Sequence, residues 1–189
     1  MKKFSLLFIL LVIVGTTQTQ AQFKVEDVTL PNTVTFSGED LTINGAGMRE
    51  KFFFDIYAGG LYLKKKNTQA NSIAAADETM AIKLHIVSGM MSRSKMESAL
   101  RDGFKKSTKG NTSSLDERIN TFVGFIKEEI EEGQIYDIVY EQGKGSVIYK
   151  DGVEKGYVEG LDFKKALFNI WIGDNPADKD LKNEMLGAF

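Results

Sequence analysis

Hydrophobic and polar residues follow two different periods along the chain, and these periods predict its secondary structure. Alternating or β-branched stretches predict strands at 23–28, 33–36, 41–44, 52–63, 79–87, 135–141, 146–150 and 155–158. Apolar residues recurring every three to four positions predict two helices between 92 and 130 and two after 161, with a weakly helical stretch at 68–76. This order predicts an α+β fold, in which a large, mostly antiparallel sheet is covered on one face by helices.

The two central helices carry signals at their ends. Ser92 can cap the first helix, and Ser114 with Glu117 fits a capping box for the second. The apolar stripe of the second helix runs on to Ile130, so the acidic stretch 128–132 is expected at its C-terminal end. Acidic groups at that end oppose the preference of the helix dipole.

The stretch 52–63 has the strongest strand pattern. Both of its faces are largely apolar, so we expect a central strand that is covered on both sides. The small residues Ala58, Gly59 and Gly60 leave room for a helix, another strand or a ligand to approach closely. The preceding Gly45-Ala46-Gly47 predicts a glycine-rich turn before the strand.

The N-terminus has the three regions of a secretory signal peptide. Two lysines precede an apolar stretch from Phe4 to Val14, and Thr19-Gln20-Ala21 is an acceptable cleavage site. The stretch has about 11 residues, short of the roughly 20 needed to span a bilayer. We therefore expect residues 1–21 to be removed after Ala21 and residues 22–189 to form one exported domain, periplasmic or secreted, with no later membrane span. The lysine start and the lack of cysteine favour a bacterial envelope.

Composition removes several classes of function. The chain has no cysteine and one histidine, which excludes disulfides, thiolate metal sites and sites with several histidines. The histidine, His85, lies in a predicted strand without a partner motif, so we interpret it as a surface or hydrogen-bonded residue. The net charge of −2 becomes −4 without the signal peptide, which gives no reason to expect nucleic-acid binding. No cofactor or metal motif is present, because the glycine-rich stretch 45–50 lacks the context of a dinucleotide fingerprint.

Arg49 and Tyr57 are the residues best suited to a binding site. A guanidinium with a nearby phenol can hold a carboxylate or phenolate through charge-assisted hydrogen bonds. Small residues beside them would admit an apolar ligand body. From spacing alone, the alternative is that Arg49 pairs with a surface acid while Tyr57 belongs to the core.

Three segments in the same order resemble one known family. They are Gly45-Ala46-Gly47-Met48-Arg49 with the strand that ends Gly60-Leu61-Tyr62-Leu63, the helix start 92–97, and the C-terminal stretch 164–173 with 180–182 and 186–187. Over residues 28–187 the chain resembles the chalcone isomerase superfamily, and within it the exported bacterial chalcone isomerase-like proteins. The resemblance implies an open-faced sandwich with a cleft between the sheet and the helices.

The resemblance also implies which residues face the cleft. Chalcone isomerases use an arginine to hold the substrate phenolate, and Arg49 matches it. Four other polar positions of the enzymes fall here at Tyr57, Met91, Ser98 and Ile170. The non-catalytic branch binds fatty acids through an arginine and a tyrosine, which Arg49 and Tyr57 match better.

We therefore expect a protein that binds a small amphipathic anion, such as a fatty acid or a phenolic acid. The candidate wall residues are Phe53, Leu61, Met91 and Trp171. One alternative is an isomerase, or intramolecular lyase, that acts on a chalcone-like or unknown enone, in which Arg49 stabilises an oxyanion and Tyr57 is an acid or base. A second alternative is a non-catalytic structural domain of the envelope. The oligomeric state is not predicted.

Overall fold

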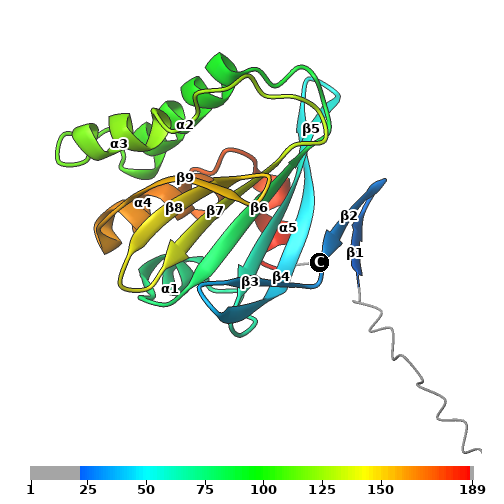
Figure 1. Cartoon of the computed structure of the whole chain (residues 1–189), viewed down its shortest axis with the longest axis horizontal. Helices are drawn as coiled ribbons and strands as arrows, with labels where there is room; N and C mark the ends of the chain where they lie inside the picture. Colours follow the sequence, from blue (N-terminus) through cyan, green and yellow to red (C-terminus); the bar gives the residue numbers. More distant parts are fainter. Residues whose placement is uncertain (1–21, 188–189) are drawn as a thin grey trace, which may run out of the picture.

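A meandering sheet of seven antiparallel strands organises the chain in a computed structural model, which describes residues 22–187 (Figure 1). In spatial order the strands are β3 (Thr33–Phe36), β4 (Glu39–Lys51), β5 (Phe54–Leu63), β6 (Met80–Ile86), β7 (Ile135–Glu141), β8 (Gly145–Lys150) and β9 (Val153–Val158). A separate hairpin, β1 (Gln22–Val25) with β2 (Val28–Pro31), precedes them. The predicted signal peptide and its cleavage site after Ala21 lie outside the described residues.

The helices are α1 (Ala70–Ala75), α2 (Arg93–Ser107), α3 (Asp116–Val123), α4 (Leu161–Ile172) and α5 (Lys179–Met185). Helix α4 packs against α1, α2 and α5, and it is the most buried helix of the layer. The side chain of Ser92 accepts a hydrogen bond from the backbone of Lys95, as expected for the cap of α2. The predicted α+β fold is confirmed: the helices gather on one side of an antiparallel sheet (Figure 1).

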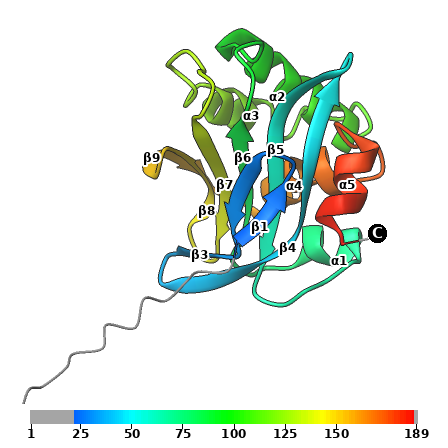
Figure 2. The same cartoon turned by 90° about the vertical axis from the view of Figure 1, so that its right-hand side faces the viewer.

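The two faces of the sheet support two separate cores. The larger core lies between the sheet and the helices, and it includes Tyr57, Leu61 and Trp171. The smaller one lies on the other face, where Val25 and Leu30 of the β1–β2 hairpin pack against β4 and β5. Figure 2 shows this hairpin in front of the strands, with α5 beside β4. The central strand β5 is therefore covered on both sides, as its two apolar faces predicted.

The glycine-rich stretch lies inside β4, so the predicted turn at Gly45–Gly47 is wrong. A side chain on Gly45 would overlap the backbone carbonyl oxygen of Glu184 in α5, and one on Gly47 would overlap the Glu184 side chain. On β5, a Cβ at Gly59 would lie 2.7 Å from Met185 Cε. These glycines permit α5 to pack closely on the sheet. The sequence pattern alone had been interpreted as a turn.

Replacing Gly45 by alanine is expected to destabilise the protein by about 2–3 kcal/mol. The new methyl group would meet main-chain atoms of α5, and backbone cannot move aside as a flexible side chain can. Urea unfolding followed by circular dichroism measures the change. Gly89→Ala is the matched control, because a Cβ at Gly89 meets no atom within 4 Å. Equal stability of the two variants would contradict this explanation of the glycine.

The second central helix is shorter than predicted. Helix α3 ends at Val123, and its N-cap residue Leu115 makes no side-chain cap hydrogen bond, so the predicted capping box does not form. Ile126 and Ile130 are nevertheless buried, at 4% and 6% exposure, in non-helical chain. The spacing of apolar residues thus reflected burial and not a continuous helix. The acidic stretch 128–132 is consequently not at a helix end.

Candidate functional site

Arg49 and Tyr57 are direct cross-strand partners in β4 and β5. Arg49 Nη1 donates a hydrogen bond to Tyr57 Oη at 3.2 Å, and the guanidinium carbon lies 5.5 Å from the centre of the tyrosine ring. Within residues 22–187, no carboxylate forms an ion pair with Arg49. The guanidinium is half-buried and retains donors for an anionic ligand.

Trp171 of α4 fixes the phenol from the helix side. Its Nε1 donates to Tyr57 Oη at 2.9 Å, and the side chains of both residues are almost fully buried. The phenol oxygen therefore accepts two hydrogen bonds, from Arg49 and from Trp171. Because a hydroxyl has two acceptor sites and one hydrogen, its own hydrogen is left to donate to a third group. Sheet and helix layer together hold one arginine and one phenol at fixed positions.

A pocket of about 210 Å³ opens beside the arginine, between the end of the β4–β5 hairpin and α2. Its lining residues are Arg49, Lys51, Phe52, Ile56, Met90, Met91, Lys95 and Ala99. Most of the wall is apolar, and every charged side chain in the lining is basic. We call this hollow the Arg49 pocket. Its charge and its wall fit the carboxylate and the tail of an amphipathic anion.

A β-bulge places Ile56 in this pocket. Arg49 pairs with Tyr57 whereas Glu50 pairs with Asp55, so Ile56 is the extra residue of β5. A bulge interrupts the alternation of side chains and re-aims one of them. Ile56 consequently joins the same core as Tyr57, although strict alternation would place the two on opposite faces.

The other predicted site residues lie in three settings: at or next to the Arg49 pocket, in the buried core, and on the exposed surface. Met91 lines the Arg49 pocket, whereas Trp171 contacts the site through the Tyr57 hydroxyl. Leu61 is fully buried in the core beneath, and Ile170 is buried at a position where a Cβ on Gly103 of α2 would meet it at 2.6 Å.

The two remaining predicted residues are exposed. Ser98 is exposed on α2 outside the lining, and its neighbour Ala99 lines the pocket instead. Phe53 is 100% exposed. The predicted strand 52–63 is wrong at its start, because Phe52 and Phe53 form the turn between β4 and β5. This turn carries Phe53 away from the wall to which the sequence assigned it.

Sequence reasoning missed several lining residues, namely Lys51, Phe52, Ile56, Met90, Lys95 and Ala99. Three of them could have been found. Lys51 is two residues after Arg49 on the same strand, so period-two alternation places both on one face. Lys95 and Ala99 are four residues apart on α2, which also places them on one face. The loop residue Met90 has no such signal.

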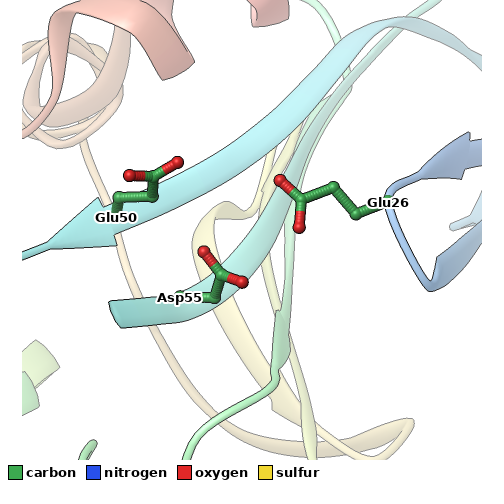
Figure 3. A group of neighbouring side chains, drawn as sticks. All are labelled: Glu26, Glu50 and Asp55. Carbon is green, nitrogen blue, oxygen red and sulfur yellow. The ribbon is translucent and has the colours of Figure 1, made fainter. Parts of the chain in front are cut away.

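The opposite side of the same hairpin is acidic. Glu26, Glu50 and Asp55 have carboxylate oxygens within 4.8 Å of one another. Figure 3 shows these three side chains gathered between β4, β5 and the β1–β2 hairpin. All three side chains are exposed, and the nearby Asp55 carboxylate raises the pKa of Glu26 above its ordinary value. Alternation along β4 separates the charges, since Arg49 and Lys51 line the Arg49 pocket while Glu50 lies among acids. An anionic ligand is therefore favoured on one side of the hairpin only.

A comparison with protein families agrees with this arrangement. A family model described as chalcone isomerase-like matches residues 21–187. The chain belongs to the chalcone isomerase-like family. The resemblance to the chalcone isomerase superfamily is thereby confirmed over residues 21–187.

The chain is also similar to a fatty-acid-binding protein of Arabidopsis thaliana. The curated protein "Fatty-acid-binding protein 1" is 24% identical over an alignment of length 178, and the match covers 79% of this chain and 64% of that protein's length. The crystal structure of an Arabidopsis fatty-acid-binding protein has a TM-score of 0.70 at 19% identity, covering 88% of this chain and 96% of the solved one. This structural likeness confirms the chalcone isomerase-like fold. Within residues 22–187, no helix is long and apolar enough to cross a membrane.

Proposed function

We propose that this protein binds a fatty acid or a similar small amphipathic anion in the Arg49 pocket. The carboxylate accepts hydrogen bonds from Arg49, which the buried Tyr57 positions from outside the pocket lining, and the tail lies along Ile56 and Met91. One observation carries the proposal: a half-buried arginine without an acidic partner among the described residues stands at an apolar pocket lined by bases. An arginine with a purely structural role would be expected to pair with an acid.

The relatives support the same ligand class. The curated relative and the solved structure both carry the name of an Arabidopsis fatty-acid-binding protein, and the family model spans the segments that hold Arg49, Tyr57 and Trp171. The pocket itself limits the tail. Its volume of about 210 Å³ is below the roughly 300 Å³ at which ordinary ligand sites begin. A short tail fits this space, and a longer tail requires α2 or the hairpin to move outward.

Isothermal titration calorimetry with octanoate and octanol tests the proposal. The two molecules share a tail, so their difference isolates the carboxylate. We expect octanoate to bind at least about tenfold more tightly than octanol, because charge-assisted hydrogen bonds to a guanidinium are stronger than neutral ones. Equal affinities, or binding of neither molecule, would contradict the proposal and leave the isomerase and structural alternatives.

The proposal also includes export, with cleavage after Ala21 and function in the periplasm or outside the cell. The charged, apolar and small-residue regions of residues 1–21 support it. The family model begins at residue 21, next to the predicted cleavage site, which also supports it. N-terminal sequencing of the protein from its own host tests the cleavage site, and an intact Met1 would contradict it.

A further inference from the structure

Large apolar side chains are exposed together at one end of the molecule. Phe52, Phe53 and Phe54 at the turn between β4 and β5 are 79%, 100% and 55% exposed, and Met90 in the neighbouring loop is 42% exposed. We call these four residues the hairpin tip. In Figure 1 the β4–β5 hairpin extends beyond the rest of the sheet, next to the loop before α2. A cluster of exposed aromatics is unusual on a soluble surface and marks an interaction site.

The backbone of the tip makes these aromatics more notable. Phe52 has φ 52° and Phe53 has φ 65°, so both central residues of the turn are left-handed. Asparagine followed by glycine is the preferred pair in such a turn, since bulky residues with positive φ are strained. Phe53 is fully exposed, so its side chain contributes no burial that offsets this strain within the described structure. We therefore interpret the tip as a functional feature, because other residues at this turn would give a more stable fold.

Basic groups flank the tip on the side of the Arg49 pocket, and the acids Glu50 and Asp55 lie on its other side. Lys51 Nζ lies 5.8 Å from the centre of the Phe52 ring, and Lys95 Nζ donates to the carbonyl oxygen of Met90 at 2.8 Å. Both lysines also line the Arg49 pocket, whose lining holds no acid. Aromatic side chains between lysines match the boundary between headgroups and acyl chains of an anionic bilayer.

We infer that the hairpin tip inserts into the surface of an anionic phospholipid membrane, with Lys51 and Lys95 at the headgroups. This inference rests on the proposed function, since Phe52 and Met90 also line the Arg49 pocket. A fatty acid leaving the bilayer would thus enter beside the arginine. A narrow, projecting turn suits insertion better than a protein interface, which typically needs about 800 Å² on each partner.

Co-sedimentation of the purified protein with vesicles tests the inference. We expect binding to vesicles of phosphatidylcholine with an equal part of phosphatidylglycerol, weakened by salt, and much weaker binding to phosphatidylcholine alone. Replacing both lysines, as Lys51→Gln with Lys95→Gln, should weaken binding to the anionic vesicles by about 25-fold, at about fivefold for each lysine. Absence of binding to the anionic vesicles overturns the inference.

The double variant Phe52→Asn/Phe53→Gly separates insertion from folding. It creates the preferred turn pair, so its thermal stability should equal or exceed that of the natural protein. Its vesicle binding should nevertheless fall at least about tenfold, because two aromatic anchors are lost. The matched control Val153→Asn/Tyr157→Asn removes two exposed apolar side chains elsewhere, at 59% and 45% exposure, and should bind normally. Equal vesicle binding of the two double variants overturns the inference.

Two further measurements assign any failure. Analytical ultracentrifugation tests whether the tip instead binds a second copy of the chain. If the natural protein is a dimer and the Phe52→Asn/Phe53→Gly variant is a monomer, the tip is a contact between copies and membrane docking is overturned. Octanoate calorimetry without vesicles, on Phe53→Asn, tests the pocket separately, since Phe53 is not in its lining. Octanoate binding without vesicle binding overturns the docking alone. Vesicle binding without octanoate binding supports the docking and overturns the proposed function.

Discussion

Replacing Arg49 by glutamine is expected to weaken octanoate binding by about a hundredfold or more. Truncating one partner of a buried, hydrogen-bonded charge pair costs about 2–5 kcal/mol, much of it from the unpaired charge left behind. In the variant that unpaired charge is the ligand carboxylate, which would sit beside a neutral amide. Lys51 and Lys95 also line the pocket, but both are exposed to solvent and compensate little.

Calorimetry with octanoate measures this loss, and the thermal unfolding temperature reports whether the variant is folded. Glutamine keeps a hydrogen-bond donor near Tyr57, so the melting temperature should change little. Arg101→Gln is the matched control, because Arg101 is an exposed arginine of α2 that hydrogen bonds to Asn120. A folded Arg49→Gln variant that binds octanoate like the control would show that the anion lies elsewhere.

The pairing of Arg49 with Tyr57 was indicated by the family resemblance, since spacing alone left open an ion pair between Arg49 and a surface acid. The structure adds that the two residues are cross-strand partners, which the predicted glycine-rich turn had not suggested. The pocket wall could not be predicted in the same way. Its Ile56 is aimed by a bulge, and its boundary at Phe52 depends on a turn whose residues lack the usual asparagine–glycine signal.

Long-range packing explains the other differences between sequence and structure. The glycines at 45 and 47 lie in a strand because α5, some 140 residues later, packs against them. The stripe that ends at Ile130 has helical spacing, yet the chain beyond Val123 leaves the helix and places Glu128 near two lysines. Glu128 pairs with Lys150 at 2.7 Å and with Lys155 at 3.3 Å. These two ion pairs explain the acidic residue at 128, which would be unfavourable at the C-terminal end of a helix.

Lys164 is the clearest example of a role that only the tertiary structure gives. This lysine of α4 is fully buried, and its Nζ donates to the carbonyl oxygens of Ile73 at 2.8 Å, Ala74 at 3.1 Å and Ala76 at 2.8 Å. These carbonyls belong to the end of α1, where a helix runs out of internal donors, although the oxygen of Ile73 also accepts from Ala76 N at 3.3 Å. A cation there is also favoured by the helix dipole. Lys164 thus attaches α1 to α4.

Replacing Lys164 by methionine is expected to destabilise the protein by about 3 kcal/mol at neutral pH. Methionine has a similar length but no donor, so buried carbonyl oxygens lose their hydrogen bonds. Urea unfolding measures the change, and the neighbouring Lys165→Met is the control because Lys165 is exposed. Unaltered stability of Lys164→Met would mean that the end of α1 does not depend on the ammonium.

The stability of the natural protein and that of Lys164→Met should depend differently on pH. Burial lowers the pKa of Lys164 from 10.5 to about 8, opposed by the charges of Glu78 and Asp77. At a pH between these two pKa values, Lys164 is protonated in the unfolded chain and neutral in the folded protein. Unfolding therefore takes up a proton, and rising pH opposes unfolding. The free energy of unfolding of the natural protein, minus that of Lys164→Met, should therefore rise between pH 8 and pH 10.5, by at most about 1.4 kcal/mol per pH unit. A flat or falling difference would instead mean that the three carbonyls keep the ammonium charged despite its burial.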